Sequence, residues 1–261
     1  MNPHDPVTST PPLGVLAALP QELGDLVDAM RAEGTMRTVT IGRRDYHVGT
    51  VHGTPCVVTL ARIGKVAAAA SASALIHVFG VRQMIFTGVA GGVGPGVRVG
   101  DIVVGETLMQ HDLDASPLFP RYEVPLLGHA RFAADTGLSN QLAAACERFV
   151  ADEGAALVER FRLHGARVHR GLIVSGDRFV SSAQEVRSLA AALPDALAVE
   201  MEGAAIAQVC YEHDVACAIV RTISDTADDH ATASFTSFLT DIAGAYSSGI
   251  LRRFLAAYAP A

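Results

Sequence analysis

The alternation of short apolar segments with longer helical patterns most constrains how this chain can fold. Apolar segments that read as buried strands lie at 13–18, 82–88, 100–106, 170–176, 196–200 and 216–224. Segments with a helical pattern lie at 20–33, 65–80, 138–151, 184–192, 201–213 and 235–257. Such an alternation is typical of an α/β fold with a largely parallel central sheet.

Three further β-rich segments, RTVTIG, DYHVGTVH and TPCVVTLA, are bounded by Gly, Pro or Thr and predict a hairpin or meander. The section 110–165 is more polar and less readily assigned. No linker or repeat divides the chain, so we expect a single domain over 13–261. The Pro-rich, polar residues 1–12 are expected to form a disordered tail.

The composition bears on the partners of the chain. Its formal net charge is −7 and it has no run of Lys or Arg, which makes nucleic acid and anionic membrane surfaces poor candidates and leaves a small neutral or cationic ligand open. No segment resembles a secretory signal or approaches the roughly 18 apolar residues of a membrane span. The four cysteines form no CxxC pair, so we expect buried thiols in a reducing compartment, with neither disulfides nor a metal site. The sequence predicts a cytoplasmic protein.

Unusual residues gather where the predicted strands end, which is where ligands bind in open α/β sheets. The segments concerned are 18–22, 88–92, 175–180, 200–202 and 221–225. The stretch LAVEMEGAAI places Glu200 and Glu202 among apolar residues, and an ionised carboxylate is costly there unless something pairs with it. Several carboxylates in one partly dry pocket would suit acid/base chemistry on a neutral substrate.

Each of these features also has a purely structural interpretation. Glu22 could complement a helix dipole, Asp225 could cap a helix or turn, and Phe179 could be a core or rim aromatic instead of a ring that stacks on a ligand. The segment TGVAGGVGPGVRVGD has neither a Gly-Lys-Ser/Thr sequence nor the G-x-G-x-x-G spacing, so it is neither a P-loop nor a dinucleotide fingerprint. It offers bare backbone that a ligand can approach closely.

Five segments resemble the 5′-methylthioadenosine/S-adenosylhomocysteine nucleosidases, namely ARIGKVAAAASA, TGVAGGVGPGVRVGDIVV, GLIVSGDRFV, AVEMEGAAIAQVC and VRTISDTAD. These enzymes belong to the purine nucleoside phosphorylase/uridine phosphorylase superfamily, and the similarity runs from about 13 to 255 in order. It implies a nucleoside phosphorylase-like α/β fold, a three-layer α/β/α sandwich with a mixed, partly barrel-like central sheet. It also implies a homodimer, without cofactor or metal, that hydrolyses the N-glycosidic bond between adenine and a 5′-thioribose.

The resemblance implies roles for individual residues. Asp225 is similar to the general acid toward adenine N7, and Glu22 to the residue that orients and deprotonates the attacking water. Glu202, with Met201 beside it, is similar to the acceptor of the ribose hydroxyls. The other substrate-binding residues implied are Phe179 and the backbone of Val180 as an adenine cradle, Val89, Ala90 and Gly91 at a strand end, and Arg221 and Ser224 as supporting residues.

The chemistry explains these residue types. Adenine is a poor leaving group as an anion, so Asp225 would act protonated, which requires a pKa raised by burial. The sugar gains oxocarbenium character as the bond breaks, and an ionised Glu202 would position the ring and favour its positive charge. Glu200 receives no catalytic role, and we expect it to make a structural hydrogen bond.

The sequence departs from the family pattern in three places, and the third of them leaves the 5′ substituent open. Val89 stands where the family often has Ser or Thr, and Leu19, Pro20 and Gln21 stand where it typically has Met and acidic residues. In the segment 110–128 only HD.D matches, and in the family this region closes the 5′ pocket of the neighbouring subunit. Here that apolar wall would consist of Leu118, Phe119 and Pro125.

Other functions remain open from the sequence. The chain could be a nucleosidase for another 5′-modified adenosine, such as 5′-deoxyadenosine or aminodeoxyfutalosine, or a nucleoside phosphorylase. Phosphorolysis needs cations around a phosphate dianion, which Glu22 would repel, although Arg62 and Arg221 could be recruited. A catalytically silent binding or storage protein would need none of the three carboxylates, so their presence argues for an enzyme.

Overall fold

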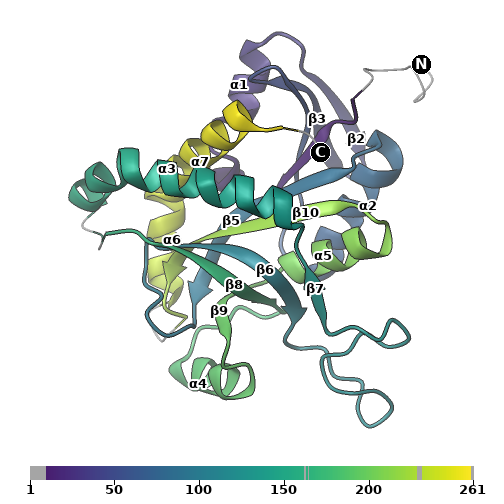
Figure 1. Cartoon of the computed structure of the whole chain (residues 1–261), viewed down its shortest axis with the longest axis vertical. Helices are drawn as coiled ribbons and strands as arrows, with labels where there is room; N and C mark the ends of the chain where they lie inside the picture. The colour runs from purple at the N-terminus through teal and green to yellow at the C-terminus, as the bar shows by residue number, and fades with distance from the viewer. Residues whose placement is uncertain (1–9, 162, 164, 228–230, 260–261) are drawn as a thin grey trace.

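The computed structural model describes residues 10–161, 163, 165–227 and 231–259 (Figure 1). Residues 1–9 of the predicted tail lie outside this part of the chain. The strands are β1 (Leu13–Ala17), β2 (Arg37–Ile41), β3 (Arg44–Val51), β4 (Thr54–Leu60), β5 (Gln83–Gly92), β6 (Ile102–Gln110), β7 (Arg131–Ala133), β8 (Val168–Ser175), β9 (Ala196–Glu200) and β10 (Ala216–Asp225). The helices are η1, a 3₁₀ turn (Pro20–Leu23), α1 (Leu26–Ala32), α2 (Lys65–Phe79), α3 (Thr136–Phe161), α4 (Ala183–Ala192), α5 (Gly203–Glu212), α6 (Ala231–Asp241) and α7 (Ala243–Ala257).

The strands form a mixed sheet, part of which closes on itself. β1 and β10 each pair with β5 in parallel, and β6, β8 and β9 form a second parallel group. The two groups run in opposite directions, because the pairs β10–β6 and β5–β9 are antiparallel. β5, β10, β6, β8 and β9 thus form a closed ring, from which β1, β4, β3 and β2 extend. These pairings confirm the mixed, partly barrel-like sheet implied by the resemblance and correct the largely parallel sheet expected from the alternation.

The point where the ring closes brings strand ends together. Gly91 and Gly92 of β5 pair with Val199 and Ala198 of β9, and Asp225 at the end of β10 pairs with Gly91. Because β9 is antiparallel to β5, the two strands approach this point from opposite directions. The carboxyl ends of β5, β9 and β10 therefore converge although these strands do not share one direction.

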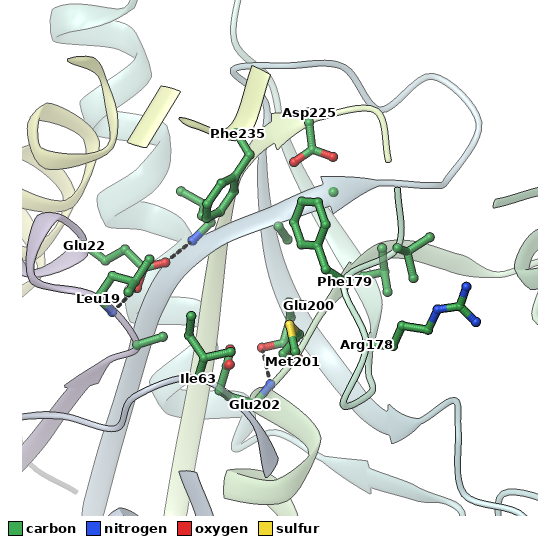
Figure 2. A pocket seen from close by; sticks show the side chains of 16 residues that line it. Leu19, Glu22, Ile63, Arg178, Phe179, Glu200, Met201, Glu202, Asp225 and Phe235 are labelled. Carbon is green, nitrogen blue, oxygen red and sulfur yellow. Dashed lines mark hydrogen bonds between the residues drawn. The ribbon is translucent and has the colours of Figure 1, made fainter. Parts of the chain in front are cut away.

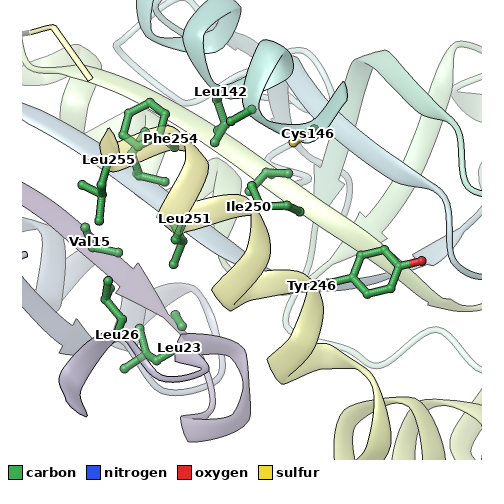
Figure 3. Close-up of a cluster of buried hydrophobic side chains, with 14 of the residues drawn as sticks. Val15, Leu23, Leu26, Leu142, Cys146, Tyr246, Ile250, Leu251, Phe254 and Leu255 are labelled. Atoms are coloured by element: carbon green, nitrogen blue, oxygen red, sulfur yellow. The ribbon is translucent and has the colours of Figure 1, made fainter. Parts of the chain in front are cut away.

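Helices cover both faces of the sheet (Figure 1). α3 and α7 pack against each other on one face, and α2 and α5 pack against each other on the other. Figure 3 shows the core beneath α3 and α7, where Leu142 and Cys146 lie near Ile250 and Phe254. The second core contains Ala68, Ala72 and Leu75 of α2, and small side chains there allow the helix to approach the strands closely. This arrangement confirms the three-layer α/β/α sandwich.

Several predicted boundaries differ from the structure; the helix predicted at 138–151, for example, is α3 and continues to Phe161. The segment 20–33 is a 3₁₀ turn followed by α1, because Gly24 adopts a φ of 57° that neither helix accepts. The segment 235–257 contains parts of two helices, α6 and α7. The strand predicted at 82–88 continues to Gly92, since its glycines pair with β9 and β10 and do not form a turn.

The structure also bears on the predicted meander, the cysteines and the membrane span. The predicted meander is present as the antiparallel strands β2, β3 and β4. All four cysteines are buried free thiols. Among the described residues, no helix combines the length and apolar character needed to cross a membrane.

Candidate active site

A cavity of about 380 Å³ lies where β1, β5, β9 and β10 end. Most of its lining is apolar, and its volume lies near the lower end of the range of about 300–1,000 Å³ typical of small-molecule sites. Figure 2 shows Glu22, Glu202 and Asp225 at separate positions around this cavity. The predicted site residues that line it are Glu22, Val89, Ala90, Gly91, Phe179, Val180, Met201, Glu202 and Asp225.

Glu22 reaches the cavity from the 3₁₀ turn after β1, and only 3% of it is exposed. Its Oε2 accepts a hydrogen bond from the Leu19 N–H at 2.7 Å, and its Oε1 accepts one from the Val89 N–H at 3.0 Å (Figure 2). Burial raises the pKa of Glu22 above its ordinary value, although the Arg221 charge and these amides act against it. A raised pKa makes the carboxylate a stronger base, and the two amides fix its orientation.

Gly88 leaves room for a buried charge cluster behind the cavity. A Cβ at this position would lie 2.8 Å from Glu22 Oε1 and 2.9 Å from Arg221 Nη1. The Arg221 guanidinium lies 3.9 Å from the centroid of the Phe86 ring, and its Nη2 donates to Glu200 Oε2 at 2.6 Å. Any side chain at position 88 would displace one of these charged groups.

Glu200 organises the turn between β9 and α5. It accepts hydrogen bonds from Ser175 Oγ, from the Glu202 N–H at 3.0 Å and from the Gly203 N–H at 2.9 Å, besides that from Arg221. A buried carboxylate with this many donors is well compensated. The expected structural hydrogen bonding of Glu200 is confirmed.

Glu202 lies at the start of α5 with 5% of it exposed, and its Oε1 accepts a hydrogen bond from the Gly64 N–H at 2.8 Å. Burial, followed by the charge of Glu200, raises the pKa of Glu202 to about 8, while Arg221 and the Gly64 amide act against this rise. Hydroxyl groups that donate to Glu202 would favour its ionised form, because hydrogen bonds to a carboxylate stabilise its charge. The side chain is thus suited to a polar ligand that supplies the missing donors.

We expect Glu202→Gln to gain stability relative to the wild type as the pH rises from about 5 to about 9. The pKa of Glu202 rises from the ordinary 4.5 to about 8 on folding, so the folded chain holds this proton more tightly than the unfolded one. The resulting stabilisation is complete below about pH 4.5 and is lost as the pH rises through about 8. Gln stays neutral and avoids this loss. Thermal denaturation of both proteins across this pH range measures the effect.

The control for this experiment is Glu147→Gln, which changes an exposed carboxylate on α3. Its melting-temperature difference from the wild type is expected to change little over the same pH range. A pH-independent difference for Glu202→Gln as well would contradict the raised pKa of Glu202.

Asp225 is the last residue of β10 and is 2% exposed. Figure 2 shows it in a different part of the cavity wall from Glu22. Its carboxylate accepts a hydrogen bond from Ser224 Oγ at 2.8 Å and one from the Ala227 N–H at 2.8 Å. A Cβ at Gly91 would lie 2.9 Å from Ala227 Cβ and 3.1 Å from Asp225 Oδ1. The glycine-rich strand therefore brings bare backbone against this carboxyl.

Two aromatic rings contribute to the cavity wall. Phe179 is 39% exposed, and its ring centroid lies 5.5 Å from that of Phe235 in an edge-on arrangement. Phe235 was not predicted as a site residue, because it begins a segment that reads only as a helix and carries no further signal. Ile63 was not predicted either, although it lies inside the ARIGK segment that contributes to the resemblance.

Some predicted site residues lie elsewhere. Arg221 and Ser224, expected among the substrate-binding residues, are buried behind the cavity wall, where they contact Glu200 and Asp225. The cavity lining found within the described part of the chain does not include Leu118, Phe119 or Pro125. Their contribution to the pocket of a partner subunit remains a prediction.

In the described ranges, no group of three or more His, Cys, Asp or Glu side chains is arranged as a metal site.

Comparisons with known proteins agree with one another. A family profile described as the phosphorylase superfamily matches residues 12–256. The 5′-methylthioadenosine/S-adenosylhomocysteine nucleosidase of Actinobacillus succinogenes is 37% identical over 229 residues, which cover 87% of this chain and 91% of that protein. The aminodeoxyfutalosine nucleosidase of Helicobacter pylori is 32% identical over 227 residues, with the same coverage of both chains.

A solved structure extends this similarity to the fold. The 5′-methylthioadenosine/S-adenosylhomocysteine nucleosidase of Neisseria meningitidis, in complex with methylthio-immucillin-A, superposes with a TM-score of 0.83 at 35% identity. The match covers 95% of this chain and 100% of that one. The chain therefore belongs to the phosphorylase superfamily, and within it to the group of enzymes that contains the 5′-methylthioadenosine/S-adenosylhomocysteine nucleosidases.

Proposed function

We propose that this protein hydrolyses the N-glycosidic bond of 5′-methylthioadenosine and S-adenosylhomocysteine, releasing adenine and the 5′-thioribose. The observation that carries the proposal is that Glu22, Glu202 and Asp225 line one largely apolar cavity. 5′-Methylthioadenosine has a flat base, two ribose hydroxyls and an apolar 5′-methylthio group, and these properties match the aromatic, acidic and aliphatic parts of the lining.

In the proposed mechanism Asp225 donates a proton to N7 of adenine while the bond to the sugar breaks, so that the base leaves without a full negative charge. Glu202 accepts hydrogen bonds from the ribose hydroxyls and favours the positive charge that develops on the sugar. Glu22 takes a proton from a water molecule that attacks the sugar. The base lies between Phe179 and the backbone of Val180.

Water, and not phosphate, is the proposed nucleophile. The carboxylate of Glu22 would repel a phosphate dianion, and Val89 supplies no hydroxyl to bind one. The buried Arg221 already forms an ion pair with Glu200, at 2.6 Å. The cation behind the cavity wall is thus engaged in a structural contact, and Arg178, which lines the cavity, pairs with Glu185.

The test is base release from 5′-methylthioadenosine, S-adenosylhomocysteine, adenosine and inosine, each with and without phosphate. Rapid, phosphate-independent release of adenine from the two thioethers is expected. Phosphate-dependent release would identify a phosphorylase, and an absence of release from every substrate would favour a binding or storage protein. Aminodeoxyfutalosine and 5′-deoxyadenosine belong in the same experiment, since the Helicobacter relative is named for the former compound.

We further propose that the enzyme is a cytoplasmic homodimer that acts in methionine salvage. The four buried free thiols suit a reducing compartment. Leu118 is 84% exposed in the single chain, and an apolar side chain of this kind is a candidate for burial against a second subunit. Sedimentation equilibrium tests the dimer, and a monomer at micromolar concentration would contradict it.

A further inference from the structure

The start of α2 contacts two parts of the site at once. The Gly64 N–H donates to Glu202 Oε1 at 2.8 Å, and the next amide, the Lys65 N–H, donates to Asp177 Oδ1 at 2.8 Å. Glu202 is the proposed acceptor of the ribose hydroxyls. Asp177 begins the loop that carries Phe179, so successive residues of one helix end contact both the sugar site and the base site.

The side chain of Lys65 joins the same contacts. It is only 15% exposed, and its Nζ donates to Asp112 Oδ1 at 2.6 Å and to Gln110 Oε1 at 3.0 Å. It also lies 3.8 Å from Asp177 Oδ2. A largely buried ammonium group with these partners is held in one position more firmly than an exposed lysine.

Asp112 completes a triangle of charged groups. Its Oδ2 accepts a hydrogen bond from the Asp177 N–H at 2.8 Å, while its Oδ1 binds Lys65. Burial acts to raise the pKa of Asp112, but the hydrogen bonds from Lys65 and Asp177 outweigh it and hold that pKa below its ordinary value. The triangle Lys65–Asp112–Asp177 thus links α2, the segment after β6 and the loop after β8.

This loop, residues 176–182, needs such an anchor because open space lies on both of its sides. One side faces the candidate active site, and Val180 and Arg178 also line a second cavity of about 580 Å³ together with His111 and Asp112. Val180, near the end of the loop, packs into an apolar cluster with Val174 and Leu189, whereas Asp177 and Arg178 at its start are exposed and gain little restraint from packing. Charged hydrogen bonds at the start of the loop are a physical substitute for that packing.

We propose that Lys65 and Asp112 are positioning residues that hold loop 176–182 in place, so that Phe179 and Val180 form a ready-made cradle for the base. This inference rests on the proposed function for the identity of the ligand. The geometry of the tether itself is independent of the reaction. The two residues act on the base, while the sugar contact through the Gly64 amide does not depend on their side chains.

The first test is amide hydrogen exchange of the ligand-free protein. In Lys65→Met and in the near-isosteric Asp112→Asn, exchange over 176–182 is expected to be about tenfold faster or more, since each loses a charged hydrogen bond. Matched controls are Arg131→Met and Asp195→Asn, which remove a surface ion pair of 2.6 Å. Unchanged exchange over 176–182 in both Lys65→Met and Asp112→Asn would overturn the proposal.

The second test separates base from sugar. The inhibition constant of adenine is expected to rise about tenfold in Lys65→Met and in Asp112→Asn. The double variant is expected to show the same rise as each single variant, because the two side chains act as one unit. Inhibition by 5-methylthioribose is expected to stay unchanged. Equal weakening for both products would overturn a role specific to the base. A wild type that releases no base would overturn the proposed function alone, because the exchange experiment needs no ligand.

Discussion

Asp225→Asn is expected to lower kcat for 5′-methylthioadenosine by about 10²-fold or more, on the usual magnitude of general-acid catalysis. Asparagine keeps the shape of the side chain and the place beside Ser224 Oγ and the Ala227 N–H, but it has no proton to transfer to adenine N7. The loss should therefore appear in kcat more than in KM. Single-turnover release of adenine measures the chemical step directly.

A change of leaving group provides the sharper version of this test. In a 4-nitrophenyl 5-methylthioriboside the leaving group is 4-nitrophenolate, a stabilised anion that needs no proton from the enzyme. Asp225→Asn should therefore cleave this substrate at nearly the wild-type rate. The control Asp195→Asn removes a surface carboxylate and should behave as the wild type on both substrates. Near-normal turnover of methylthioadenosine by Asp225→Asn would remove Asp225 from the general-acid role.

Glu22→Gln is expected to lower kcat by a similar factor, about 10²- to 10⁴-fold, for the opposite reason. Glu22 would act as a base, and its raised pKa, which is chiefly a result of burial, increases its proton affinity. Glutamine can still occupy the space beside the Val89 N–H but cannot accept a proton from water. Because water attack is required whatever the leaving group, Glu22→Gln should be slow on the nitrophenyl substrate as well.

The pH dependence supplies a second readout for Glu22. Only the ionised carboxylate acts as a base, so wild-type kcat should rise as the pH rises through the raised pKa of Glu22, and Glu22→Gln should lose this limb. Glu147→Gln on α3 serves as the matched control and should keep the wild-type profile. A Glu22→Gln enzyme with an unchanged acidic limb would show that another group controls the reaction.

The predicted elements were recovered well where one local pattern decides the structure. The small-residue helix at 65–80 and the strand at 196–200 are present as α2 and β9 with nearly the predicted bounds. The glycine-rich stretch after 88 was predicted less well. Local chemistry makes Gly91 and Gly92 typical of a turn, but pairing with β9 and β10 extends the strand through them, and that pairing joins residues more than 100 positions apart.

In the candidate site, too, the residues marked by local sequence were predicted and those placed by long-range contacts were not. Short segments at the predicted strand ends drew attention to Glu22, Glu202 and Asp225, because acidic residues stand out in apolar surroundings. Phe235 gave no such signal, since an aromatic residue near the start of a helix usually packs into a core. Arg221 was predicted as a supporting residue of the substrate site, but its partner Glu200 was not predicted, because this pairing depends on how two distant strands face each other.

The sequence by itself determined which side chains can perform chemistry and which segments are buried, because hydrophobic period and residue type are local properties. Only the tertiary structure decided that these side chains face one cavity. β9 runs antiparallel to β5 and pairs with its end at Gly91 and Gly92, and Glu202, which follows β9 at the start of α5, lines the same cavity as Glu22 and Asp225. Strand direction and register are fixed by contacts between distant parts of the chain, and no local pattern contains them.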